Sequence, residues 1–88
     1  MFAYEMTESL REDARAAAEM AAIYAADARE FQRALDQLPA GRPLMRAELA
    51  RRLADARQFF ADFSAQEKAA LELRAAAIKA LKHASRAA

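Results

Sequence analysis

The stretch Leu38-Pro-Ala-Gly-Arg-Pro-Leu44 contains both prolines and the only glycine of this 88-residue chain. Pro39 cannot continue a helix, Gly41 permits a left-handed turn, and Pro43 suits the first turn of a following helix. The remaining sequence carries no comparable breaker and is dominated by residues that favour helix, with alanine at 27 positions. The sequence therefore predicts an all-α chain that folds back on itself at residues 39–42.

The segment before this turn has the periodicity of a coiled coil. From Leu10 to Leu38, apolar residues follow alternating spacings of four and three, and many of them are alanine. Ser9 and Glu12 form a capping box, so the predicted first helix covers about residues 7–38. A face made of alanine needs a neighbour that fills space beside it.

The segment after the turn repeats this spacing and then departs from it. A second helix is predicted over about residues 43–63. Continuing its spacing beyond Phe63 would bury Glu67 and Arg74, and Ser64 forms a second capping box with Glu67. These features predict a corner at Ser64 and a third helix over about residues 65–86.

The predicted architecture is one domain over residues 1–88, an antiparallel three-helix bundle with a long alanine-rich first helix. The alternative is a two-helix hairpin with a long kinked second helix, which would dimerise into a four-helix bundle. In either case, antiparallel packing pairs residues whose numbers sum to about 82. This register places Tyr24 near residues 56–60 and lays the phenylalanines at 59, 60 and 63 on the alanine face. A second helix ending at Phe63 covers about 31 Å, so roughly the first nine residues of the first helix would project beyond it.

Composition argues against several kinds of chemistry. The chain has no cysteine, which excludes disulfides and thiolate metal sites, and one glycine cannot make a glycine-rich phosphate loop. His83 is the only histidine, and Ser85 is too close to it in sequence to face it on a helix. We therefore expect a protein that is not an enzyme, with no catalytic residue, metal or cofactor.

The sequence also gives no sign of a membrane protein. It lacks an apolar run of about 18 residues and the basic and apolar segments of a signal peptide. Its alanine faces are poor lipid anchors, so we expect neither a membrane span nor a membrane-surface role, and a cytoplasmic location.

The distribution of apolar and charged residues points to protein binding. Residues 1–38 carry a net charge of −4 and residues 39–88 a net charge of +5. Large apolar residues at the N-terminus either close the open end of the bundle or dock on a second copy or another protein. The sequence favours a small interaction protein, homodimeric, that occludes a basic or nucleic-acid-binding partner as adaptors, antitoxins and phage-type inhibitors do. The candidate contact residues are Phe2, Tyr4, Met6, Glu8, Leu10, Glu12 and Asp13.

The C-terminal sequence gives a second candidate function, binding of DNA or RNA. From Leu73 onward there is no acidic residue, and a basic stripe is formed by Arg74, Lys79, Lys82 and Arg86. Such a stripe can contact phosphates of DNA or RNA. It also fits a solvated helix end, where cations complement the helix dipole.

Overall fold

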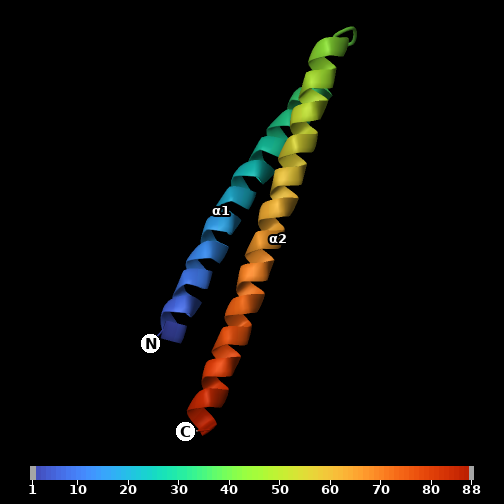
Figure 1. Ribbon diagram of the computed structural model, residues 1–88. Coiled ribbons are helices and arrows are strands. Elements are labelled where there is room, and N and C mark those ends of the chain that lie inside the picture. Colours follow the sequence, from blue (N-terminus) through green and yellow to red (C-terminus); the bar gives the residue numbers. More distant parts are fainter. Residues whose placement is uncertain (1, 88) are drawn as a thin grey trace.

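The chain forms two long helices joined by a short turn. The computed structural model describes residues 2–87, and the surroundings of the side chains of residues 4–86. Helix α1 spans Phe2–Gln37 and helix α2 spans Pro43–Ala87, and the two run antiparallel as a hairpin (Figure 1). The Cα atoms extend over 72 × 14 × 13 Å, so the molecule is a rod. The prediction of an all-α chain is confirmed.

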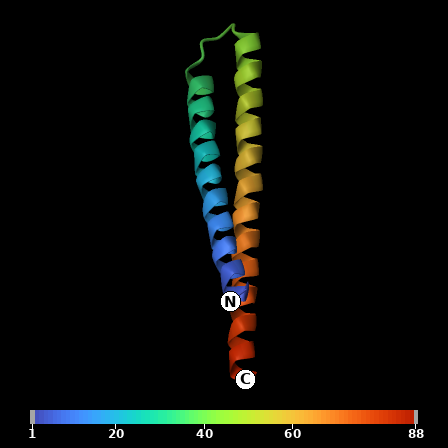
Figure 2. The ribbon, with the colours of Figure 1, turned by 60° about the vertical axis from the view of Figure 1, so that its left-hand side comes forward.

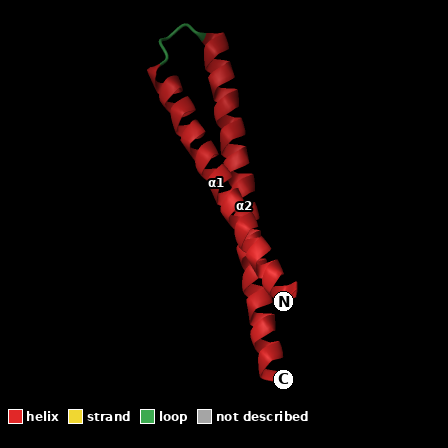
Figure 3. Cartoon of the chain, turned by 90° about the vertical axis from the view of Figure 1, so that its left-hand side faces the viewer, coloured by secondary structure: helices red, strands yellow, loops and turns green. Residues whose placement is uncertain are grey.

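The turn between the helices has the geometry that its sequence predicts (Figure 3). Gly41 has a φ of 87°, in the left-handed region that glycine adopts without a steric penalty. Pro43 is the first residue of α2, where its missing N–H costs no hydrogen bond. The carbonyl of Arg42 accepts the backbone N–H of Arg46 at 2.9 Å, which closes the first turn of α2.

The prediction of a third helix is wrong. Helix α2 runs unbroken through Ser64, so the chain is a two-helix hairpin and not a three-helix bundle (Figure 2). The break was predicted because a continuous seam places Glu67 and Arg74 against the first helix. In a hairpin, the edges of the seam are open to solvent, so these long side chains stay half-buried without a break in the helix.

Helix α1 also begins earlier than predicted, at Phe2 instead of near residue 7. The capping box expected from Ser9 and Glu12 therefore lies inside the helix, where both side chains are exposed. Thr7 is buried, and its hydroxyl donates to the carbonyl of Tyr4 at 2.8 Å. Such a hydrogen bond keeps a buried threonine hydroxyl satisfied within a helix.

Alanine lines most of the seam between the helices. Among the described residues, the buried apolar ones are Ala14, Ala17 and Ala21 of α1 and Leu53, Ala56 and Ala70 of α2. Leu53 is the only large side chain in this set. Small side chains on both helices allow a close approach, so the alanine face of α1 is covered by α2 of the same chain.

The predicted register is confirmed at the aromatic residues. The ring centroids of Tyr24 and Phe59 lie 5.0 Å apart, and Tyr24 stacks on Phe63 at 5.8 Å. However, Phe59 and Phe60 keep 45% and 43% of their surface exposed. They flank the alanine seam instead of filling it, because the closely packed helices leave no space for rings between them.

The overhang of the hairpin is opposite to the predicted one. Helix α2 continues far past Phe63, and its C-terminal end extends beyond the start of α1 (Figures 1 and 2). The N-terminal residues of α1 therefore lie alongside α2 and do not project. Between residues 2 and 87, neither helix has an apolar stretch long enough to cross a membrane.

Candidate protein interface

Half of the large apolar side chains that the structure describes are exposed on the surface of the hairpin. A two-helix hairpin has no third layer that could cover the flanks of the seam. The described residues of this kind that remain exposed are Tyr4, Met6, Ile23, Leu44, Met45, Phe59, Phe60, Leu71, Leu73 and Leu81. Exposed apolar side chains in this number make these surfaces candidates for contact with another protein.

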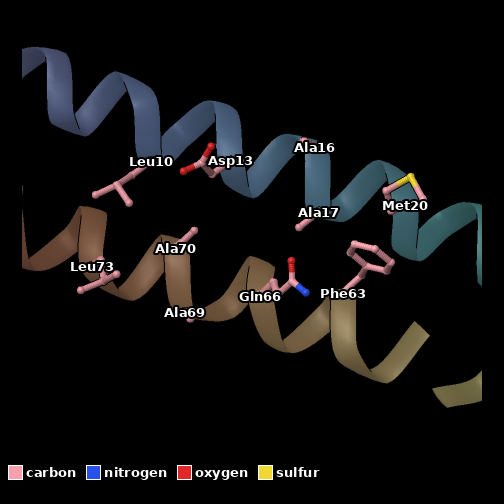
Figure 4. A pocket seen from close by; sticks show the side chains of 10 residues that line it. All are labelled: Leu10, Asp13, Ala16, Ala17, Met20, Phe63, Gln66, Ala69, Ala70 and Leu73. Atoms are coloured by element: carbon pink, nitrogen blue, oxygen red, sulfur yellow. The ribbon is translucent and has the colours of Figure 1, made fainter. Parts of the chain in front are cut away.

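An open groove runs along one flank of the seam. It has a volume of about 490 Å³ and lies between residues 10–20 of α1 and residues 63–73 of α2 (Figure 4). We call this flank the groove face. Its lining residues are Leu10, Asp13, Ala16, Ala17, Met20, Phe63, Gln66, Ala69, Ala70 and Leu73. On each helix they are separated mainly by three or four residues, so both helices present one continuous stripe to the same side.

The groove face is apolar and partly aromatic. Asp13 is the only charged residue in its lining, and Gln66 is the only other polar one. Leu73 keeps 60% of its surface exposed. Phe63 extends the lining toward Tyr24 and Phe59, whose rings contact one another in the direction of the turn. The groove is thus a hydrophobic surface with aromatic side chains at its end nearer the turn.

The charges that border the groove face are mainly acidic. Asp27 follows the groove residue Met20 by seven positions, and Asp62 precedes Ala69 by seven, so both lie on extensions of the groove stripes. Within the described part of the chain, no cation lies within 4.0 Å of the carboxylates of Asp13, Asp27 or Asp62 in an ion pair. The groove face therefore has unpaired negative charge along its border.

The basic residue on the same border is held in an ion pair within α2. Arg52 precedes Phe59 by seven positions, and its Nε donates to Glu48 Oε1 at 2.9 Å. Arg51 donates to both oxygens of this carboxylate, with a 2.7 Å bond from its Nη2 to Oε1, which it shares with Arg52, and a 3.3 Å bond from its Nε to Oε2. The hydrogen bonds from Arg51 and then Arg52 lower the pKa of Glu48 below its ordinary value. The carboxylate is thereby kept charged and holds both arginines.

The contact residues predicted from the sequence do not all lie on the groove face. Leu10 and Asp13 line the groove, and Met6 precedes Asp13 by seven positions on the same stripe. Glu8 and Glu12 instead line a separate, polar depression with two arginines of α1. Tyr4 is exposed, and the side chain of Phe2 lies outside the described residues.

Sequence reasoning missed the half of the groove that α2 supplies. The predicted register pairs Leu10 with residues near 72, and applying it beyond Phe63 identifies Gln66, Ala70 and Leu73. The corner expected at Ser64 hid this signal, because a third helix would have turned these residues away from α1.

The predicted basic stripe is not one continuous surface. Arg74 is half-buried beside α1, and its Nε is buried with no hydrogen-bond partner among the described residues. The side chains of Lys79, Lys82 and Arg86 are exposed near the C-terminal end of α2. Of the four residues of the predicted stripe, these three are fully accessible to a phosphate backbone.

In the described part of the chain, no three histidine, cysteine, aspartate or glutamate side chains come together as a metal site. Comparisons with protein-family models, with curated proteins and with solved structures found no match to this chain.

Proposed function

We propose that this protein is a non-enzymatic protein-binding protein that covers part of a partner with its groove face. The observation that supports this most directly is the open groove whose lining is apolar except for Asp13 and Gln66. An apolar surface in the centre supplies affinity, whereas a charged border sets orientation and partner choice. Covering a partner in this way is how adaptors, antitoxins and inhibitors act.

The chemistry of the groove face defines the class of partner. The acidic residues Asp13, Asp27 and Asp62 attract a basic surface, and an apolar groove along the flank of two helices can seat the apolar face of a third helix. The proposed partner therefore presents an amphipathic helix with leucine-like residues on one face and lysine or arginine beside them. A nucleic-acid-binding protein, whose own site is basic, fits this description.

A synthetic helical peptide with a leucine face bordered by lysines tests this proposal. We expect the wild-type chain to bind it, and Leu73→Asp to weaken binding by about tenfold or more, because a leucine buried in the complex is replaced by a charge. Leu44→Asp is the matched control, since Leu44 is exposed at the start of α2 and outside the groove. Calorimetric titration measures each dissociation constant.

The same peptide with glutamates in place of its lysines tests the role of the acidic border. We expect weaker binding of this peptide, and a loss of affinity for the lysine peptide as salt increases. Equal binding of both peptides, or equal binding by wild type and Leu73→Asp, would contradict the proposal.

The C-terminal end of α2 supports a second candidate function, binding of DNA or RNA. The observation in its favour is the exposure of Lys79, Lys82 and Arg86 near the C-terminal end of α2. Replacing all three by glutamate abolishes retention of nucleic acid in a filter assay at low salt if this function is real. The same variant binds the lysine peptide as wild type does if the groove face is the functional surface.

A further inference from the structure

The flank of α2 opposite the groove carries a second stripe with an unusual symmetry. Phe60, Glu67, Leu71, Arg74 and Leu81 are separated by seven, four, three and seven residues, so they share one face of the helix. We call them the α2 stripe. Phe60, Leu71 and Leu81 are exposed, and the two charged residues are half-buried. A depression of about 420 Å³ lies at the middle of the stripe, lined in part by Ser64, Glu67 and Leu71.

The α2 stripe is complementary to itself when reversed. Leu71 lies near its centre, with Glu67 on one side and Arg74 on the other, and an apolar residue at each end. A second copy of α2 running antiparallel and centred near Leu71 therefore brings Glu67 of each copy within about one helical turn of Arg74 of the other. Phe60 of each copy then lies toward Leu81 of the other. Reciprocal contacts of this kind are what a two-fold symmetric interface requires.

The charges of the stripe are not neutralised within the hairpin. Neither Glu67 nor Arg74 forms an ion pair within 4.0 Å among the described residues, and Arg74 Nε has no acceptor. The register places Glu8 of α1 at the level of Arg74 and Arg15 at the level of Glu67, but neither pair comes within 4.0 Å, and Arg15 instead pairs with Glu19 at 3.5 Å. A half-buried guanidinium without a counter-charge is costly, and an acid from a second copy would offset that cost.

We infer that the protein forms an antiparallel homodimer through the α2 stripe, held in register by reciprocal Glu67–Arg74 ion pairs. The groove face is a poorer surface for self-association, because its acidic border would meet the same acidic border of a second copy. The dimer leaves the groove face of each chain free on the outside. This inference does not depend on the function proposed for that face.

A charge-exchange cycle tests the dimer. Glu67→Arg and Arg74→Glu each place like charges opposite one another between copies, and each is expected to weaken the dimer by about tenfold or more. The double variant Glu67→Arg with Arg74→Glu restores the opposite charges and is expected to recover a dissociation constant within about threefold of wild type. Sedimentation equilibrium over a broad concentration range measures these constants, with helicity checked by circular dichroism. Glu12→Arg, on the exposed side of α1, is the control for net charge and should leave the dimer unchanged.

A covalent test uses the absence of cysteine from the sequence. With Leu71→Cys, the only thiol of each chain lies near the two-fold axis, and mild oxidation is expected to give a disulfide-linked dimer. Leu73→Cys, on the groove face, should cross-link far less under the same conditions. Because neither substitution changes a charge, this test is independent of the exchange cycle.

Three results would overturn the inference. A monomeric mass at every concentration excludes the dimer and leaves the groove proposal standing. Single charge variants that lower thermal stability without changing the dissociation constant would mean that both charges act within one hairpin. A dimer that Leu73→Asp disrupts and the charge variants do not would place self-association on the groove face, against both proposals.

Discussion

Glu48 is the residue whose electrostatics the hairpin changes most clearly. It lies four residues or fewer from both of its partners along α2, and their hydrogen bonds lower its pKa from the ordinary value of 4.5. A carboxylate with a lower pKa in the folded state adds stability at pH values above 4.5 and loses this contribution as the pH falls through the folded-state pKa. The contribution is small, because all three side chains are in contact with water.

Glu48→Gln is therefore expected to lower the melting temperature slightly at pH 7 and to have a smaller effect as the pH falls well below 4.5. Thermal unfolding followed by circular dichroism at several pH values measures the difference between the two proteins. A difference that is the same at pH 7 and in strong acid would mean that the carboxylate charge is not responsible.

At the scale of the element, a substitution at Ser64 distinguishes a continuous helix α2 from a corner between two helices. Inside α2, Ser64→Ala replaces a residue of moderate helix propensity with the best helix former and is expected to stabilise the hairpin by about 0.5 kcal/mol. At the N-cap of a third helix, the same substitution would destabilise the protein by about 1 kcal/mol. Urea unfolding in dilute solution gives the sign, and a decrease in stability would contradict the two-helix structure.

The elements also show what the sequence could predict and what it could not. The turn was predictable, because Pro39 and Pro43 fix the local backbone geometry and Gly41 is the one residue that adopts the left-handed conformation without a steric penalty. The continuity of α2 was not, because Ser64 and Glu67 have the same local sequence at a helix start and inside a helix. Whether Glu67 and Arg74 are tolerated at the edge of the seam depends on how many layers of helices cover it, and that number is a tertiary property.

The candidate interface was likewise predictable from the sequence in one half and not in the other. Leu10 and Asp13 could be identified from α1 alone, because the spacing of apolar and acidic residues marks their face. The other half of the groove requires the register between helices, which was predicted correctly but was not extended past Ser64. Alanine in the seam misled the prediction in another way, since it suggested space for phenylalanine rings where the two helices instead approach each other.

At the scale of the whole molecule, the rod shape gives a direct test of the hairpin. Its Cα radius of gyration is 19.9 Å, whereas a compact domain of this length has a radius of about 12 Å.

The proposed dimer is longer than one hairpin, because Leu71 lies six residues past the midpoint of α2 and two copies centred there are staggered. At the helical rise, this stagger adds about 18 Å to the 72 Å length of the hairpin. Small-angle X-ray scattering across a dilution series should therefore show a maximum dimension near that of one hairpin at low concentration and one about 15–20 Å longer at high concentration. A doubling of mass without this lengthening would instead indicate hairpins packed level with one another, in which Glu67 and Arg74 of the two copies do not meet.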